Sequence, residues 1–372
     1  MRLYEFPQAG KIRVGLLGAG GIATAHAMSL AKIPGVELCG IADIEHGRAR
    51  RLAERWGTDA YGSLDELLGA RPDAIHVLLP PDLHAKLAIA CIEGGAHVFV
   101  EKPLCISEAE CREVQAAAEK HGKLVAVNHN VTFEPAYLRL IEAVRQRKLG
   151  AIQHVAVFWS VPFGENAYGG PLYKKLGIGA AILETAPHPF SLITRLVGGA
   201  KSASVTMTTE TAGAGGMPDT WSIGLSCERG TAQCFMGIAR ASTDTRVHVI
   251  GEDGAATVDL KLGTLSLVEN TRFTPLFAKL ADTLAQARDL AGDAVRNFGE
   301  RLERLPSGGA CDDGVPVFRN SIASFYAALR AGGTPPAGLD EGLATVRMCL
   351  QVIGAQTEKK EVEPWAPAIA SS

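Results

Sequence analysis

A lysine directly follows a short apolar run that has the pattern of a buried strand. Residues 97–100 read His-Val-Phe-Val, and Glu101, Lys102 and Pro103 follow them directly. Upstream, a glycine-rich turn lies between an apolar run and a helical stretch, which is typical of a sheet that binds a dinucleotide. Such sheets bind their ligands at the carboxyl ends of the strands. We therefore expect the Lys102 ammonium to lie beside a nicotinamide and to act on a hydroxyl or carbonyl oxygen.

A second pair of polar residues stands at Glu184 and His188. On a helix this spacing places both side chains on one face. Imidazole titrates near neutral pH and is a common general base. Taken by itself, such a pair is more often a contact on a helix surface than part of an active site.

The turn itself reads Gly-Ala-Gly-Gly-Ile-Ala over residues 18–23. Gly18 permits the tight turn, Gly20 lets a pyrophosphate approach the backbone, and Ala23 is an accepted third residue of the dinucleotide fingerprint. The helix that begins here, at Gly21 and Ile22, offers amides to the phosphates. We predict that Gly18, Gly20, Gly21 and Ile22 bind the cofactor.

Asp43 ends the second apolar run and has the spacing of the acidic residue that binds the adenosine ribose. Its carboxylate would repel a 2′-phosphate, and Glu45 adds a second negative charge. The sequence therefore favours NAD as cofactor. Arg48 and Arg51 lie close by in the chain and keep NADP possible.

The first third of the chain alternates between two periods. Apolar runs at 12–17, 36–42, 74–79, 97–100 and 124–127 are separated by helical stretches at 22–32, 46–56, 83–93 and 108–121. This alternation predicts βαβ units and a parallel sheet covered on both faces. We predict an α/β protein whose first domain is a Rossmann domain over residues 1–128.

Beyond Asn128 the pattern changes. A helical stretch at 134–148 is followed by strand-like runs at 152–160, 202–209, 220–227, 232–238, 246–251, 256–260 and 264–268. Short strands separated by turn residues predict a large, mostly antiparallel open sheet. We assign it to a second α/β domain over residues 129–372, which would bind substrate and form the oligomer contact.

The segment 277–305 carries apolar residues at alternating steps of three and four. This predicts a long amphipathic helix. Packing against the core or capping the domain is the favoured interpretation, with a subunit contact or a lid as alternatives. Membrane-surface binding is disfavoured because basic and acidic residues are balanced along the segment.

Composition excludes several classes of protein. The 372 residues carry a net charge of −3, which gives no electrostatic reason to expect nucleic acid. No apolar run approaches the roughly 18 residues of a membrane span, and the first residues lack the apolar core of a signal peptide. The eight cysteines are scattered without metal-site spacing. We therefore expect no metal, no membrane and a cytoplasmic location with reduced thiols.

The motifs together resemble the Gfo/Idh/MocA oxidoreductases (glucose–fructose oxidoreductase, inositol dehydrogenase and relatives). The matching segments read Val-Gly-Leu-Leu-Gly-Ala-Gly at 14–20, Gly-Ile-Ala-Asp at 40–43, Leu-Pro-Pro-Asp-Leu-His at 79–84 and Gly-Gly-Ala-His-Val-Phe-Val-Glu-Lys-Pro at 94–103. Residues 179–188 and 325–330 match less closely. The resemblance covers essentially the whole chain.

This resemblance implies roles for several residues. Lys102 would be the active-site lysine, Glu101 would lie along the cofactor ribose, and Pro80 and His84 would belong to a loop that passes over the cofactor. His188 would be the general base and Glu184 would orient the substrate or His188. The family usually carries Asp where this chain has Glu184. It often has an Asn-x-Arg arrangement where this chain reads Asn-His-Asn over residues 128–130, so we assign no anion-binding role there.

We therefore expect an NAD(H)-dependent dehydrogenase or reductase that acts on a secondary alcohol or ketone carbon of a sugar, cyclitol or related polyol. We also expect a homodimer or homotetramer formed through the C-terminal sheet. Three alternatives remain open: a redox-neutral enzyme that recycles bound NAD, as in some glycosidases, a cyclic dihydrodiol dehydrogenase, and a catalytically silent regulator that senses a dinucleotide.

Overall fold

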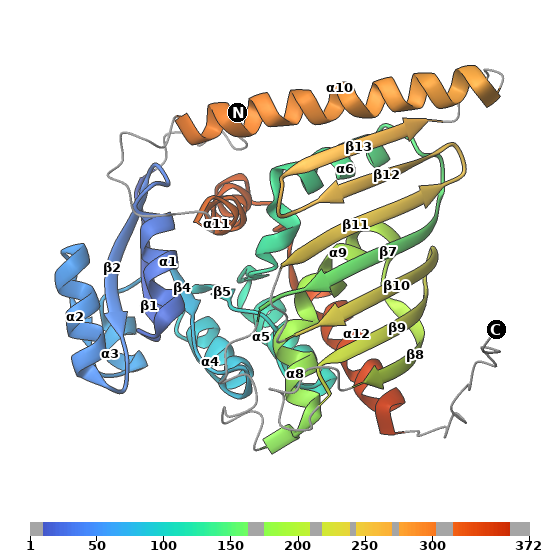
Figure 1. Cartoon of the computed structure of the whole chain (residues 1–372). Coiled ribbons are helices and arrows are strands. Elements are labelled where there is room, and N and C mark those ends of the chain that lie inside the picture. Colours follow the sequence, from blue (N-terminus) through green and yellow to red (C-terminus); the bar gives the residue numbers. More distant parts are fainter. Residues whose placement is uncertain are drawn as a thin grey trace.

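The chain forms two β-sheets that lie side by side, each covered by helices (Figure 1). The computed structural model describes residues 10–162, 175–208, 218–238, 243–269, 275–302 and 315–357. None of the helices within these ranges is both long enough and apolar enough to cross a bilayer.

The first sheet has six parallel strands in the order β3-β2-β1-β4-β5-β6. Their bounds are β1 (Ile12–Leu17), β2 (Val36–Ala42), β3 (Ala60–Tyr61), β4 (Ala74–Val77), β5 (His97–Val100) and β6 (Val125–Val127). The strand order reverses between β1 and β4. The carboxyl ends of these strands are therefore where such a sheet binds its ligand.

Helices connect the parallel strands, as the alternating periods predicted. They are α1 (Gly21–Leu30), α2 (His46–Trp56), α3 (Leu64–Gly69), α4 (Pro81–Glu93) and α5 (Glu108–His121). Ser63 caps α3 and Ser107 caps α5, each by accepting a hydrogen bond from the amide three residues later. The short elements β3 and α3 were not predicted from the sequence.

The second sheet has seven strands in the order β13-β12-β11-β7-β10-β9-β8. Only β7 and β10 pair in parallel, so the sheet is mostly antiparallel as predicted. The bounds are β7 (Ile152–Ser160), β8 (Ala200–Thr208), β9 (Thr220–Cys227), β10 (Gly230–Gly237), β11 (Asp244–Gly251), β12 (Gly254–Asp259) and β13 (Thr264–Glu269). The predicted α/β fold class is confirmed.

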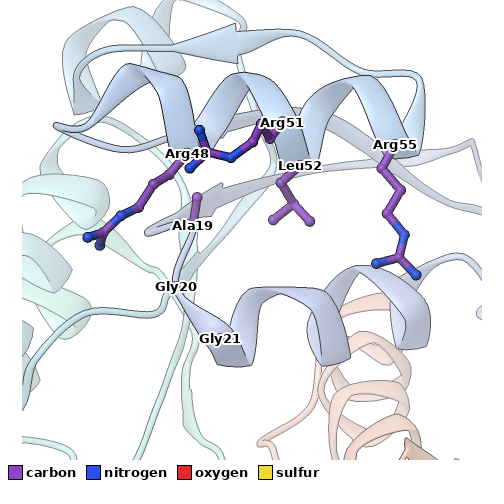
Figure 2. Close-up of a pocket in the computed structure, with 7 residues that line it drawn as sticks. All are labelled: Ala19, Gly20, Gly21, Arg48, Arg51, Leu52 and Arg55. Carbon is purple, nitrogen blue, oxygen red and sulfur yellow. The ribbon is translucent and has the colours of Figure 1, made fainter.

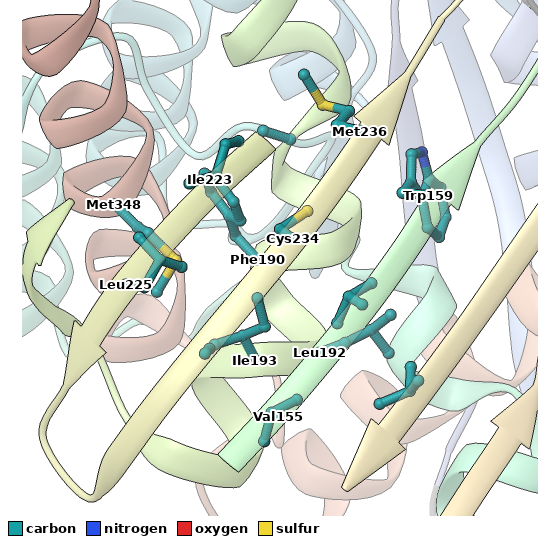
Figure 3. Close-up of a cluster of buried hydrophobic side chains, with 14 of the residues drawn as sticks. Val155, Trp159, Phe190, Leu192, Ile193, Ile223, Leu225, Cys234, Met236 and Met348 are labelled. Carbon is teal, nitrogen blue, oxygen red and sulfur yellow. The ribbon is translucent and has the colours of Figure 1, made fainter. Parts of the chain in front are cut away.

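Helices cover one face of the second sheet. They include α8 (Ile178–Thr185) and α9 (Pro187–Val197), and residues 130–145 add the 3-10 helix η1 (Asn130–Phe133) and α6 (Pro135–Arg145). Phe190 and Ile193 of α9 pack against Val155 and Ile223 of the sheet (Figure 3). The other face leaves Phe158 exposed over 45% of its surface, so this face is open within one chain.

The last two helices return to the first sheet. They are α11 (Val315–Ala331) and α12 (Leu339–Thr357). Phe325 and Tyr326 of α11 are fully buried in one core with Val14 of β1, and Val346 of α12 joins the other core of the first sheet. The domain boundary expected between residues 128 and 129 stays a prediction.

The predicted long helix is α10 (Pro275–Leu302), which runs along β13 at the edge of the second sheet (Figure 1). Its apolar stripe does not pack against the core, so that part of the favoured interpretation is wrong: Phe277, Leu284 and Phe298 are each more than 60% exposed. A polar face makes the contact instead. Asp293 is buried, accepts a hydrogen bond from the Leu265 amide at 2.7 Å and pairs with Arg139. The stretch 303–305 lies outside the described residues.

Candidate cofactor and active site

The glycine-rich turn after β1 leaves room for a dinucleotide. Gly18 has φ +107°, and a Cβ there would collide with the Leu78 carbonyl, so only glycine fits. Gly20 and Gly21 differ, because a Cβ at either residue would meet no atom within 4 Å. The space beside them is therefore open, as close approach of a pyrophosphate requires.

The first turn of α1 supplies donors for that pyrophosphate. Gly20 is the N-cap residue of α1 and offers no side-chain cap. Among the described residues, no acceptor is found for the amides of Gly21 and Ile22. Unpaired amides at a helix N-terminus favour an anion, and the residues predicted to hold the dinucleotide phosphates therefore fit that group.

Asp43 lies at the carboxyl end of β2 and holds the turn in shape. Its Oδ2 accepts a hydrogen bond from the Ala19 amide, and its Oδ1 accepts one from the Glu45 amide, both at 2.8 Å. A carboxylate has about four lone-pair sites, so these two bonds leave acceptors for ribose hydroxyls. Asp43 therefore organises the turn in addition to any contact with the cofactor.

A pocket of about 440 Å³ opens between the glycine-rich turn and α2 (Figure 2). Arg48, Arg51, Leu52 and Arg55 of α2 line one side of it. Arg48 pairs with Glu45 at 2.8 Å, whereas Arg51 makes no ion pair within the described ranges. Arg55 was not predicted to line this site, although steps of three and four from Arg48 place it on the same helix face.

The loop between β4 and α4 is tied to the segment that follows Lys102. Pro80 precedes the first turn of α4. The buried His84 ring places Nε2 2.7 Å from the Leu79 carbonyl oxygen and Nδ1 2.7 Å from that of Pro103. Burial lowers the pKa of His84. Its ring is thus engaged by main chain on both sides, and its contact with a cofactor stays a prediction.

Lys102 follows β5 directly and reaches across to the second domain. Its Nζ donates a hydrogen bond to the main-chain carbonyl of Glu184, at 2.7 Å. Burial lowers the pKa of Lys102, while the carboxylates of Glu101 and Glu184 oppose that shift. The ammonium therefore lies between the two halves of the predicted active site.

Glu184 and His188 lie on consecutive helices rather than on one. Glu184 is in the last turn of α8, and His188 is in the first turn of α9, which begins after Ala186. No hydrogen bond joins the two side chains among the described residues. The predicted orienting role of Glu184 toward His188 is therefore not visible in this geometry. Burial raises the pKa of Glu184, and the nearby Lys102 opposes that rise.

His188 is held by an aromatic ring. It stacks on Trp159 of β7, with ring centroids 5.4 Å apart, and the Trp159 side chain lies on the helix-covered face of the sheet (Figure 3). The buried Nδ1 of His188 has no hydrogen-bond partner in the described part of the chain. Burial, and then the Lys102 ammonium, lower the pKa of His188 to about 3. The imidazole is therefore neutral at pH 7.

Glu101 anchors a buried network that the sequence did not reveal. Its Oε1 contacts Nε2 of His26 at 2.8 Å and accepts a hydrogen bond from the Asn128 amide at 2.6 Å. Burial alone would raise the pKa of Glu101, but the hydrogen bonds from His26 and Asn128 and the Lys102 ammonium lower it. His26 in turn contacts His76, which contacts Tyr326. No spacing rule links these residues, which lie far apart in the chain.

His129 belongs to a separate buried cluster. Its Nδ1 lies 2.9 Å from Oε1 of Glu341, and the Nε of Arg195 donates to Oε2 of Glu341 at 2.8 Å. The Arg195 guanidinium also lies over the Phe133 ring. An arginine thus reaches this region from α9, although the chain lacks one in the segment after β6.

Comparison with known sequences decides the family. A sequence model described as "Oxidoreductase family, NAD-binding Rossmann fold" matches residues 12–129, and a model of the GFO/IDH/MocA C-terminal domain matches residues 137–257. The chain belongs to the Gfo/Idh/MocA family. It is an NAD-binding oxidoreductase, as the glycine-rich turn, Asp43 and Lys102 together predicted.

Several known proteins resemble the chain. Inositol 2-dehydrogenase of Rubrobacter xylanophilus is 33% identical over 144 residues, which are 38% of this chain and only 42% of that protein. The 1,5-anhydro-D-fructose reductase of Ensifer adhaerens is 24% identical over 94% of this chain and 98% of its own length. An oxidoreductase from Agrobacterium radiobacter, solved with NAD+, L-tartaric acid and magnesium, shares the fold with a TM-score of 0.74 at 12% identity. That match covers 94% of this chain and 97% of the other.

Proposed function

We propose that this family member is an NAD(H)-dependent dehydrogenase or reductase for a secondary alcohol or ketone carbon of a sugar, cyclitol or related polyol. The observation that carries the proposal is the Lys102 ammonium, which bridges the end of β5 and Glu184 of α8. The named relatives support the substrate class, since one acts on inositol and another on an anhydro-sugar.

The residues of this chain suit proton transfer at a substrate oxygen. Bound NAD would supply the hydride acceptor, and NADH the hydride donor. In the oxidation direction the uncharged Lys102 amine would accept the hydroxyl proton, and in the reduction direction the Lys102 ammonium would return a proton to the reacting oxygen and stabilise its developing negative charge. His188 is neutral, its Nδ1 has no hydrogen-bond partner among the described residues, and the Lys102 charge lowers its pKa, so it would help to receive or relay that proton. Lys102 is the better proton acceptor of the two, because the pKa of His188 is so low.

The open face of the second sheet supports the proposal that subunits associate there as a homodimer or homotetramer. Phe158 and Ile250 are 45% and 40% exposed on neighbouring strands of that face. Light scattering of the wild type and of Phe158→Asp would test this. An unchanged mass for the variant would show that this face is not the contact.

A substrate screen tests the proposed reaction. The purified chain and NAD would be mixed with sugars, cyclitols, sugar acids and glycosides, and the absorbance of NADH would be followed. A rise with one polyol class supports the proposal. No rise, together with NAD that stays bound through purification, would favour the redox-neutral alternative. Cofactor binding without turnover in either direction would favour a regulator.

A further inference from the structure

A chain of hydrogen-bonded side chains runs beneath the candidate active site. It begins at Tyr326 of α11, passes through His76 of β4 and His26 of α1, and ends at Glu101. The distances are 2.7 Å from the Tyr326 hydroxyl to His76 Nε2, 2.8 Å between the two Nδ1 atoms, and 2.8 Å from His26 Nε2 to Glu101 Oε1. All four residues are buried, and three of them have no exposed surface.

The hydrogens in this chain have one consistent arrangement when both imidazoles are neutral. Tyr326 donates to Nε2 of His76, His76 donates from Nδ1 to Nδ1 of His26, and His26 donates from Nε2 to Glu101. If His26 were protonated, it would donate to His76, and the ring of His76 would then donate to Tyr326. The Tyr326 hydrogen would need another acceptor, and none is found within the described ranges.

The surroundings preserve that arrangement. Phe99 lies 4.8 Å from His76 and 5.9 Å from His26 between ring centroids, and Phe318 packs edge-on against His26. Burial lowers the pKa of His76 well below its usual value. Since an unpaired polar group is costly in such an apolar setting, each ring is held to one tautomer by its neighbour.

We propose that Tyr326, His76 and His26 are positioning residues that fix the Glu101 carboxylate beside Lys102 and so set how readily Lys102 releases a proton. The inference rests on the proposed function only in assigning Lys102 to the reaction. Glu101 is the residue next to Lys102 in the sequence, and its negative charge opposes the effect of burial on the pKa of the lysine more strongly than that of Glu184. A carboxylate held in place stabilises the ammonium more than one that moves or takes up a proton.

Other groups also face Lys102. Glu184 of α8 adds a second negative charge, His188 of α9 is neutral, and the buried Cys349 thiol of α12 has a pKa raised by burial. None of these three residues touches the Tyr326–His26 chain by a hydrogen bond among the described residues. A change at His26 therefore reaches Lys102 through Glu101.

A matched pair of variants at His26 tests the proposal. In His26→Gln the side-chain amide can still donate to Glu101, whereas in His26→Leu it cannot. We expect His26→Leu to move the limb of the kcat/KM profile that reports Lys102 to lower pH by about one unit. Without the donor at His26, the Glu101 carboxylate can move or take up a proton, and it then stabilises the Lys102 ammonium less. His26→Gln should restore most of that shift. Ser29→Ala, on the same helix but outside the series of hydrogen bonds from Tyr326 to Glu101, should leave the profile unchanged.

Equal profiles for His26→Leu and the wild type would overturn the proposal. So would equal shifts in His26→Leu and His26→Gln, because these would report a packing defect rather than a lost donor. The affinity for NAD, measured by calorimetry, separates the cases further: a positioning role moves the pH profile with little change in NAD binding.

A second measurement does not depend on activity and remains informative if His26→Leu fails to fold. The rate at which an acylating reagent modifies Lys102, followed by mass spectrometry against pH, reports the proton affinity of the lysine directly. Wild type and His26→Gln should show midpoints within a few tenths of a unit. Tyr326→Phe should titrate lower, because His76 loses its donor, and Glu101→Gln should titrate lowest. An unshifted midpoint in Glu101→Gln or in Tyr326→Phe would overturn the proposal. If both shifts occur but no substrate is turned over by the wild type, the proposed function fails and the positioning role stands.

Nitrogen-15 spectra of the histidines provide the structural check. The proposed arrangement requires a hydrogen on Nε2 of His26 and on Nδ1 of His76 at neutral pH. The opposite tautomers, or a protonated His26, would contradict it.

Discussion

The two parts of the first sheet that would face the cofactor differ in the groups that make their contacts. Beside β1 and β2 the contacts come from main-chain amides, from Asp43 bonded to those amides, and from arginines that line an open pocket. Beside β5 they come from buried side chains, where Glu101 bonds to two other side chains. One region presents donors to an anion, and the other holds charges away from water.

This difference predicts how each region responds to substitution. Where main chain supplies the contacts, a single side chain can change with effects limited to its own interaction. In a buried polar network the partners left behind lose their hydrogen bonds, so effects are larger and are not additive. The following predictions use that contrast, beginning with the largest effect.

Lys102→Ala should lower kcat by about a thousandfold or more, which is the range expected for a group that handles the proton in the transition state. The Kd for NAD should change little, because the glycine-rich turn and the α1 amides lie elsewhere. Steady-state kinetics and calorimetry measure the two quantities. Lys86→Ala, which removes an exposed lysine of α4, is the control and should behave as the wild type. Near-normal turnover in Lys102→Ala would remove that residue from the mechanism.

His188→Asn should lower kcat by about a hundredfold, since proton transfer by a positioned side chain contributes that order of rate. The pKa of His188 is lowered to about 3, so its titration should not shape the free-enzyme profile near neutrality. The same shift affects stability. Folding holds the ring neutral, the unfolded chain binds the proton near pH 6.5, and stability is therefore lost as pH falls from there toward 3. Between pH 7 and pH 4 the midpoint temperature of unfolding should fall less steeply for His188→Asn than for the wild type. An equal slope for both proteins would contradict the buried neutral ring.

Asp43→Ala should weaken NAD binding by about tenfold, a size typical of lost hydrogen bonds to a charged group. Two causes act together, because the variant loses an acceptor for the ribose and releases the Ala19 and Glu45 amides. Asp43→Asn separates them: it removes the charge but keeps one acceptor for the turn. Titration of both variants with NAD and NADP measures the effect. A ratio of the two affinities that does not change would show that Asp43 does not select the cofactor.

The region beside β1 and β2, where main-chain amides make the contacts, was also the one whose contacts could be predicted from the sequence. Gly18, Gly20 and Asp43 act through local backbone geometry, and local geometry leaves a pattern in neighbouring residues. The helix α3 had such a signal as well, because Ser63 and Glu66 form the pattern of a capping box. The link from His26 to Tyr326 had no such signal in the sequence, because it depends on the packing of α11 against α1, two helices that lie far apart in the sequence. The outward direction of the apolar stripe of α10 could not be predicted for a similar reason, because the period of a helix defines its apolar face but not the neighbour that this face contacts.

Arg51→Ala sharpens the comparison with the smallest effect. The Arg51 side chain lines the open pocket and has no carboxylate partner in the described ranges, so its loss should disturb no network. NAD binding should stay within about twofold, and NADP binding should weaken by about five- to tenfold, the size of one exposed charge interaction with a phosphate. Arg50→Ala is the matched control, because Arg50 lies on the same helix, pairs with Glu54 and does not line the pocket. Equal losses for NAD and NADP in Arg51→Ala would instead show that this arginine binds a part of the cofactor common to both, and that the pocket does not distinguish them.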